Sequence, residues 1–332
     1  MKIRKTFHDS LRFLQIPLWG LGGFLLFSSC AGQKETEEQL LVNACQYKHR
    51  LDDFAWENGS AIWRAYGPKL QSIGEKSYGY DVWTKNTSEM LMDARYLQDS
   101  IMEARCDSLY DLGLDDKADS LKLVMSYHYD HGTGLDCYSV GSTLGCGAPA
   151  LMMNDSLLMP WCYESYEILE QTPEHVAFRL TYPQFELEGM TLQENRVISV
   201  DAGTLFCKSD VTFNLVSGEK KDIAGLRLAA GVILHDEDSA SLKMEKKAHG
   251  AFVAYADPTD RPDEDLGKVM VGLWMPDTDS AVETKIVQQH ATLSVPYSVG
   301  QTVTYYFGSG WSKGDCPTLN QMIEELTSLS SR

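Results

Sequence analysis

The segment from residue 128 to residue 147 holds the densest set of groups that can move protons. His128 and His131 lie there among two carboxylates, Asp130 and Asp136, and five glycines. An imidazole titrates near neutral pH, a neighbouring carboxylate can fix its tautomer, and glycine lets the backbone approach a ligand closely. The segment therefore predicts acid/base chemistry by at least one of these histidines; the alternative is that they are structural histidines in a turn-rich loop.

The same side chains can also be metal ligands. Their spacing lacks the i, i+4 pair of histidines of a helical zinc site. The seven cysteines after Cys30 contain no CxxC pair, so zinc-ribbon spacing is absent as well. We therefore expect no metal and no other cofactor. We also expect buried free thiols together with at most one disulfide.

Aromatic and basic residues are concentrated between residues 50 and 85. Indole rings stack on the C–H faces of sugars, and a guanidinium is a two-pronged donor for a carboxylate. We therefore expect Arg64 and Lys85 to neutralise a substrate carboxylate, and Trp83 and Tyr66 to contact a sugar. In the alternative, the tryptophans belong to the core and the charges pair with each other.

A third segment, residues 305–315, opens from a strand into a glycine-rich turn. Trp311 and Lys313 lie where this loop can close over a site, so both are candidates for substrate binding. His235 and His249, next to apolar strands, are acid/base candidates by position alone. No nucleophile elbow, Walker loop or dinucleotide fingerprint is present, which argues against familiar serine hydrolases, NTPases and nicotinamide enzymes.

Strand patterns dominate the part of the chain that must position these residues. Apolar residues alternate with polar ones in many segments that Gly, Pro, Asp or Asn separates, which predicts an antiparallel β-sandwich. The expected strands are 176–182, 195–200, 203–216, 226–234, 250–256, 268–275, 291–295 and 301–307. Helical spacing predicts a hairpin inserted at about 88–125 and a C-terminal helix over about 317–329. Residues 45–332 are expected to form one domain.

The N-terminus resembles the export signal of bacterial lipoproteins. Basic residues precede an apolar run that ends in small residues before Cys30, as in a lipobox. We expect residues 1–29 to be a signal peptide, Cys30 to carry lipid, and residues 30–44 to be a flexible tether. This places the protein in the cell envelope, anchored to the outer membrane. An ordinary cleaved signal or an uncleaved membrane helix is the alternative.

The chain is acidic, with a formal net charge of -18. Removal of the signal takes away four basic residues and one acidic residue, which leaves the mature chain near -21. Such a surface repels nucleic acid and anionic lipids. We therefore expect no nucleic-acid partner and no membrane contact except through the lipid anchor, while the oligomeric state stays open.

Several motifs together resemble a known family. They are Arg64-x-Tyr66-Gly67-Pro68, Asp81-Val82-Trp83-x-Lys85, the block from residue 128 to 147, and Gly308-x-Gly310-Trp311-Ser-Lys313. The chain is similar to uncharacterised-domain lipoproteins and secreted proteins that accompany polysaccharide lyases and unsaturated-uronyl hydrolases in Bacteroidetes-type polysaccharide-utilisation systems. The resemblance implies a galactose-mutarotase-like supersandwich and a link to dehydratases of unsaturated uronate oligosaccharides. Thr133 and Cys137 depart from the acidic and aromatic residues expected at these positions, which bears on the substrate.

Elimination beside a uronate carboxylate needs a cation, a base and an acid. The hypothesis assigns Arg64 and Lys85 to the carboxylate, and His131 with His128 to proton transfer. Trp83 and Trp311 would stack on the sugar, while Asp130 and Asp136 would orient an imidazole or bind a hydroxyl group. The expected partner is an oligosaccharide substrate. The alternatives are a sugar-binding lipoprotein without catalysis and a mutarotase-like sugar epimerase.

Overall fold

The computed structural model describes residues 39–330 except residues 237 and 278–280. The predicted signal peptide, the lipid-carrying Cys30 and most of the predicted tether lie outside the described residues. The folded part begins slightly before the expected boundary at Cys45, because Val42 is fully buried and the first strand starts at Asn43. Among the described residues, none of the helices has the length and apolar character needed to span a bilayer.

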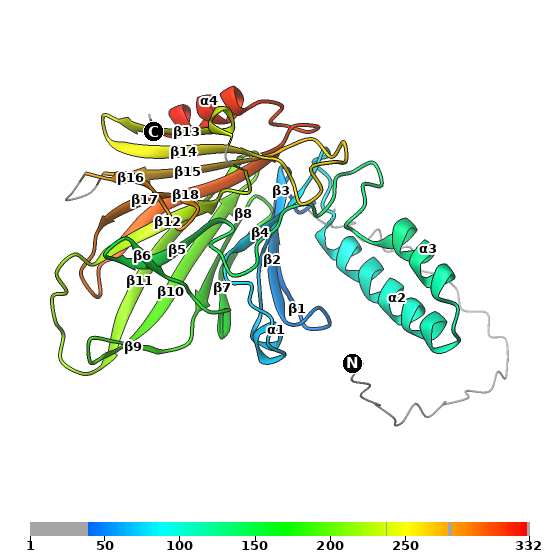
Figure 1. Cartoon of the computed structure of the whole chain (residues 1–332), viewed down its shortest axis with the longest axis horizontal. Coiled ribbons are helices and arrows are strands. Elements are labelled where there is room, and N and C mark those ends of the chain that lie inside the picture. Colours follow the sequence, from blue (N-terminus) through cyan, green and yellow to red (C-terminus); the bar gives the residue numbers. More distant parts are fainter. Residues whose placement is uncertain (1–38, 237, 278–280, 331–332) are drawn as a thin grey trace, which may run out of the picture. The chain divides into compact units, whose positions relative to one another are not determined.

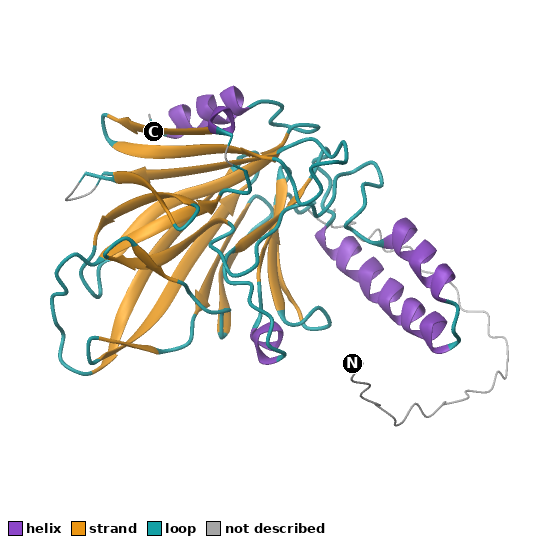
Figure 2. Ribbon diagram, viewed as in Figure 1, coloured by secondary structure: helices purple, strands orange, loops and turns teal. Residues whose placement is uncertain are grey.

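Strands form three antiparallel sheets, which dominate the ribbon diagrams (Figure 1 and Figure 2). The four-stranded sheet has the order β1 (Asn43–Tyr47), β2 (Asp53–Glu57), β3 (Ala61–Ala65) and β4 (Tyr80–Thr84). The five-stranded sheet has the order β16 (Glu283–Val287), β17 (His290–Pro296), β12 (Arg227–Ile233), β5 (Cys146–Met153) and β6 (Ser156–Leu158).

The nine-stranded sheet is the largest. Its order is β13 (Leu242–Lys247), β14 (Gly250–Asp257), β15 (Val269–Pro276), β18 (Thr302–Trp311), β11 (Phe206–Ser217), β10 (Met190–Asp201), β8 (His175–Thr181) and β7 (Ser165–Gln171), with β9 (Phe185–Leu187) paired to β10. In β10 every second residue is buried, so one face of this sheet is polar and the other packs on the core.

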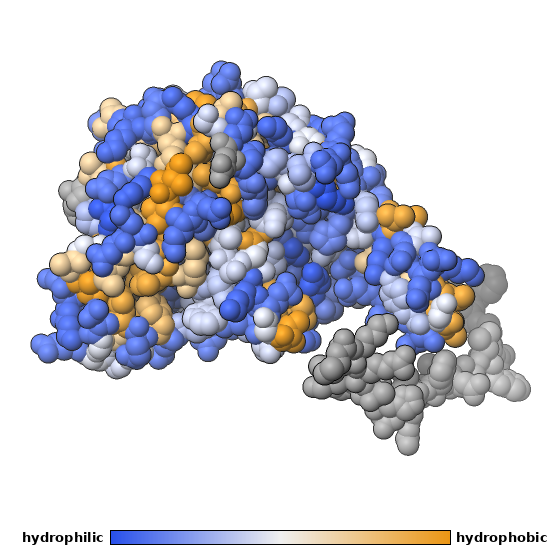
Figure 3. Space-filling view, in the orientation of Figure 1, coloured by the Kyte–Doolittle hydropathy of each residue, from blue (hydrophilic) through white to orange (hydrophobic). Residues whose placement is uncertain are grey.

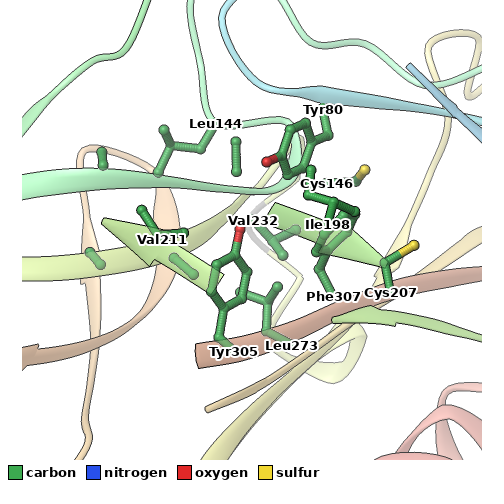
Figure 4. Close-up of a cluster of buried hydrophobic side chains, with 14 of the residues drawn as sticks. Tyr80, Leu144, Cys146, Ile198, Cys207, Val211, Val232, Leu273, Tyr305 and Phe307 are labelled. Carbon is green, nitrogen blue, oxygen red and sulfur yellow. The ribbon is translucent and has the colours of Figure 1, made fainter. Parts of the chain in front are cut away.

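The core lies between the nine-stranded sheet and the other two sheets. Figure 4 shows Tyr80 of β4 and Cys146 of β5 meeting Ile198, Leu273 and Phe307 of the nine-stranded sheet. The rings of Tyr80 and Phe307 stack with their centroids 4.8 Å apart. The sheets therefore form a sandwich, and the prediction of a mainly antiparallel β fold is confirmed.

Four α-helices accompany the sheets in the described part of the chain, in addition to a short 3-10 helix at Ser239–Ser241. They are α1 (Pro68–Ser72), α2 (Met92–Asp111), α3 (Asp115–Met125) and α4 (Leu319–Leu329). Helices α2 and α3 lie side by side as a hairpin beside the four-stranded sheet (Figure 1), within the expected range of 88–125. The predicted C-terminal helix is confirmed as α4, which is capped by the Thr318 hydroxyl.

Helix α4 packs on the polar side of the nine-stranded sheet, against an apolar strip that includes Phe252 and Trp274. Gly272 of β15 makes this contact possible, because a Cβ atom there would lie 2.7 Å from the Met322 sulfur. Elsewhere the visible surface is mostly hydrophilic, as the acidic composition predicts (Figure 3). The seven cysteines within the described residues are free thiols, and six of them are buried.

Candidate functional site

The candidate site lies on the side of the four-stranded sheet that faces away from the sandwich core. Arg64 of β3 is paired in register with Asp81 of β4, and its neighbours Trp63 and Val82 belong to the core cluster. Because side chains alternate along a strand, Arg64 and Asp81 project from the opposite face. Helix α2 and the segment after α3 cover this face, so Arg64 is only 4% exposed.

Three carboxylates surround the Arg64 guanidinium. It lies 3.3 Å from Asp53 and 3.3 Å from Asp136, and it also donates a short hydrogen bond to Asp81. We call these four residues together with His128 the Arg64 cluster. One cation facing three buried anions leaves an excess of negative charge, which favours protonation of a carboxylate.

The excess negative charge affects mainly the pKa of Asp136. Burial, followed by the charge of Asp81, raises the pKa of Asp136 well above its usual range, although Arg64 opposes the rise. Burial also raises the pKa of Asp53. Asp136 is therefore the carboxyl group of the cluster best placed to hold a proton near neutral pH.

His128 connects the cluster to solvent. Its Nδ1 lies 3.5 Å from Asp136 Oδ2, and 48% of its side chain is exposed. Burial of the ring and the positive charge of Arg64 lower the pKa of His128, so the neutral imidazole is favoured. A neutral imidazole beside a protonated carboxyl group is an arrangement that can accept and pass on a proton.

Aromatic hydroxyl groups line the cover of the cluster. Tyr96 of α2 donates to Asp53 over 3.4 Å, and the Tyr127 hydroxyl accepts a 3.2 Å hydrogen bond from Arg50. Tyr66, a predicted binding residue, is half-buried with its hydroxyl 3.4 Å from Arg64, so the structure brings it into the site. Sequence reasoning missed Asp53 among the site residues. The available signal was a carboxylate directly before the apolar residues of a short strand.

Lys85 does not join Arg64 as expected. Its ammonium is fully buried and donates to Glu57 over 2.6 Å and to the Asn58 carbonyl over 2.7 Å. Burial lowers the pKa of Lys85, and the charge of Glu57 only partly offsets this effect. The geometry corrects the predicted role, because an ammonium held by an internal carboxylate is not offered to a substrate.

The two tryptophans expected to stack on sugar are interior residues. Trp83 is fully buried, with Tyr127 stacked on it at 4.3 Å and Arg64 within 5.1 Å of its ring. Trp311 is 1% exposed and its indole N–H donates to the carbonyl of Leu266. Neither ring presents a face to a ligand, so the alternative of core tryptophans holds for both.

Three further predicted residues lie on the surface. A ring nitrogen of His131 is 3.0 Å from the Ser126 carbonyl oxygen, and the described contacts do not bring this histidine to Arg64. Asp130 accepts hydrogen bonds from the amides of Gly132 and Gly134, which shapes the turn. Lys313 donates to the Asp265 carbonyl. Of the segment 128–136, the structure therefore brings His128 and Asp136 to the site.

The described residues contain no group of three or more His, Cys, Asp or Glu side chains arranged to hold a metal ion. Two large hollows lie away from the Arg64 cluster, both on the polar face of the nine-stranded sheet. One, of about 820 Å³, adjoins α4 and includes Lys208 and Tyr306. The other, of about 860 Å³, is lined by side chains such as Arg179 and Asn195.

Comparison with known proteins gives a family and distant structural similarities. The chain is 26% identical over 272 residues to Uncharacterized protein P7 of Formosa agariphila, covering 80% of this chain and 60% of P7. The chain thus spans less than two thirds of that relative.

Two structures of the GH36 α-galactosidase AgaA from Geobacillus stearothermophilus, one with 1-deoxygalactonojirimycin and one with raffinose, align at 11% and 10% identity. Their TM-scores are 0.36 and 0.34, with 82% of this chain and 42% of the enzyme covered, and this likeness carries no argument about activity. The model of a domain of unknown function, DUF4861, matches residues 29–328. Since that match covers most of the sequence, the chain belongs to the DUF4861 family.

Proposed function

We propose that this protein is a carbohydrate-active enzyme that works by acid/base elimination on uronate-containing oligosaccharides. The observation that carries the proposal is the pair of His128 and Asp136 at the solvent-facing edge of the Arg64 cluster. Burial and the charge of Arg64 lower the pKa of the imidazole, whereas burial and the charge of Asp81 raise the pKa of the adjacent carboxyl group. Such opposite pKa shifts in neighbouring groups are typical of proton-transfer sites.

In the proposed reaction, His128 removes the proton on the carbon next to the carboxylate of a saturated uronate unit. The C–H electron pair forms a carbon–carbon double bond, and the C–O bond on the neighbouring carbon breaks. The departing oxygen takes a proton and leaves as water or as the hydroxyl end of a saccharide. Asp136 orients the imidazole, while Arg64 fixes Asp136 in place.

The substrate carboxylate needs a cation other than Arg64 and Lys85, since both are held by internal carboxylates. We assign this role to Arg261. Its guanidinium donates a 2.6 Å hydrogen bond to the carbonyl of His128, and 24% of its side chain is exposed. Arg261 also lies 3.3 Å from Asp260 and 3.9 Å from Glu264, in partly exposed pairings that a substrate carboxylate can replace.

We further propose that the enzyme works in the cell envelope, anchored by lipid on Cys30. The N-terminal sequence supports this location. The measurement is mass spectrometry of the N-terminal peptide from membranes. A peptide that begins at Cys30 and carries acyl chains supports the anchor, and a peptide that begins elsewhere contradicts it.

The test of the function is incubation with saturated uronate oligosaccharides and with lyase-generated unsaturated ones, followed by mass spectrometry. Loss of one water supports a dehydratase, and a cleaved product supports a lyase. His128→Gln is expected to lower kcat by about a hundredfold or more. An unchanged substrate mass with every oligosaccharide, in the presence of folded protein, contradicts the proposal.

A second candidate function is capture of sugar without catalysis. It is favoured by the two hollows on the polar face of the nine-stranded sheet, on the opposite side of the sandwich from the Arg64 cluster. Binding that survives His128→Gln but is lost on Asn195→Ala, without product formation by the wild type, would identify this function. Faster anomer exchange without a mass change would identify a mutarotase-like epimerase.

A further inference from the structure

A second pair of histidine and aspartate lies outside the Arg64 cluster. His235 Nδ1 is 2.6 Å from Asp257 Oδ2. The Asp257 side chain is completely buried, whereas 22% of the His235 side chain is exposed. A buried carboxylate that holds one ring nitrogen, while the ring itself reaches solvent, is the arrangement found where an imidazole transfers protons.

The surroundings of this pair carry features that packing alone does not explain. The hydroxyl groups of Tyr138 and Thr259 are buried, and neither has a hydrogen-bond partner among the described residues. Thr259 also has a φ of 75°, a left-handed conformation that a β-branched residue rarely adopts. Strained backbone and unsatisfied polar groups are concentrated at functional sites. The Tyr138 ring meets His235 edge-on at 5.4 Å.

The two centres share the same two chain segments. Asp136 and Tyr138 are two residues apart, and the amide of Asp260 donates to the carbonyl of Cys137 between them over 2.9 Å. The next residue, Arg261, donates to the carbonyl of His128. Residues 257–261 are thus hydrogen-bonded to residues 128–138. Asp136 and His128 in the second segment belong to the Arg64 cluster, and Asp257 in the first segment holds His235.

Elimination requires two proton transfers at different atoms of the substrate, one at carbon and one at the departing oxygen. His128 and Asp136 are 3.5 Å apart and interact directly, so they act as one proton-transfer unit. We propose that His235, positioned by Asp257 and assisted by the Tyr138 hydroxyl, is the acid that protonates the departing oxygen. This inference rests on the proposed elimination on uronate oligosaccharides.

The charges around His235 favour the protonated form that an acid needs. Burial lowers the pKa of His235, but the hydrogen bond and charge of Asp257 outweigh burial, so the net shift is upward. The Ser139 backbone and the charge of Asp236 act in the same direction. The Tyr255 hydroxyl donates a hydrogen bond to Asp236 and accepts one from the amide of His235. His290 is a further titratable group that interacts electrostatically with His235.

The atoms of the step balance. His128 gains the proton from carbon, the double bond forms, and the C–O bond electrons go to the departing oxygen. That oxygen takes the proton of the His235 imidazolium and leaves. Exchange with solvent then removes a proton from His128 and returns one to His235, so no oxidant, reductant or further reactant is needed.

The test compares His235→Gln with a matched control, His175→Gln. His175 Nδ1 lies 2.6 Å from Asp201, the same distance as in the His235 pair, but the Asp201 side chain is 70% exposed. We expect His235→Gln to lower kcat on the uronate oligosaccharide that the wild type turns over by about a hundredfold or more. The control should retain wild-type activity. A kcat of His235→Gln equal to wild type would overturn the inference while leaving the proposed function intact.

Two further variants separate catalysis from folding. In wild type, activity should fall as pH rises through the pKa of His235, because the acid loses its proton. Asp257→Asn should move this fall to lower pH, since it removes the group that raises the pKa. Tyr138→Phe removes only a hydroxyl group that has no hydrogen-bond partner among the described residues. Its melting temperature should therefore not fall below that of wild type, while its kcat should be lower. Unchanged pH profiles and unchanged turnover in these folded variants would contradict the role, and an inactive wild type would overturn both proposals together.

Discussion

Replacing Lys85 by methionine tests whether this residue holds the fold or binds substrate. Its ammonium is fully buried, 2.6 Å from Glu57 Oε1. The Glu57 carboxylate also accepts the amides of Leu91 and Met92 over 2.7 and 2.8 Å, where α2 begins. The pair therefore links Lys85, directly after β4, through Glu57 at the end of β2 to the start of α2, the helix that covers the Arg64 cluster.

The expected cost follows from the burial of both partners. Removing one member of a buried ion pair costs about 3–5 kcal/mol, because the other charge stays buried without its counterion. In Lys85→Met the Glu57 carboxylate keeps its two amide donors, so we expect a loss near the lower end, about 3 kcal/mol. At about 2–4 °C for each kcal/mol, the melting temperature should fall by about 6–12 °C.

The assay is urea unfolding and thermal melting of Lys85→Met, Glu57→Gln and the double variant. The double variant should lose less stability than the sum of the single variants, because it leaves neither charge alone. Lys285→Met is the matched control: its ammonium lies 2.7 Å from Asp155, but both side chains are more than half exposed. This control should unfold like wild type.

One result would refute the reasoning about Lys85. If Lys85→Met unfolds like wild type but no longer turns over substrate, then the ammonium is available to ligand. The role predicted from its position in the sequence would then be right, and the structural assignment to the ion pair with Glu57 would be wrong.

Three other predictions follow from the described contacts. Burial and the charge of Glu103 raise the pKa of Asp99 from 3.8 to about 6, so ionisation of Asp99 destabilises the fold as pH rises through that range. Asp99→Asn cannot ionise. Between pH ~4 and pH ~8, its free energy of unfolding in urea should therefore rise by about 2–3 kcal/mol relative to that of wild type. Equal pH dependence in both proteins would contradict this. His131→Gln should keep wild-type kcat, and a large loss would return this histidine to the mechanism. Trp311→Phe should lower the unfolding free energy by about 1–3 kcal/mol and leave KM unchanged, since Trp311 packs in the core; a raised KM would indicate contact with substrate.

The sequence predicts strands that have one solvent-exposed face, and it also predicts long apolar strands. In β10, buried residues alternate with partly exposed ones, and the sequence shows this as alternating apolar and polar residues. The strand was therefore predicted over part of its length. In β2, β3 and β4 every residue is buried, because the core lies on one side and α2 with the segment after α3 covers the other. β14 and β15 are buried almost throughout as well, yet they were predicted because they are longer apolar runs. β2, β3 and β4 have five residues each and contain charged residues, so neither a period-two pattern nor a long apolar run marks them.

The site was predicted only in part for a related reason. The motifs pointed to Arg64, Tyr66, His128 and Asp136, which the structure brings together. They could not show that Lys85 pairs with Glu57, or that Trp311 faces the interior. Those outcomes depend on which strand face each residue occupies and on what covers it, and both are set by tertiary contacts far apart in the chain.

The position of β18 constrains how the chain reaches this fold. This strand, one of the last elements in the sequence, lies between β15 and β11 in the nine-stranded sheet. Until residues 302–311 emerge from the ribosome, β13–β15 and β7–β11 are two separate half-sheets, each with an open edge that can pair with another molecule. A chaperone that keeps nascent segments apart would therefore protect this protein most before its final tenth is made, and a premature stop codon near its end should yield aggregates rather than a smaller stable domain.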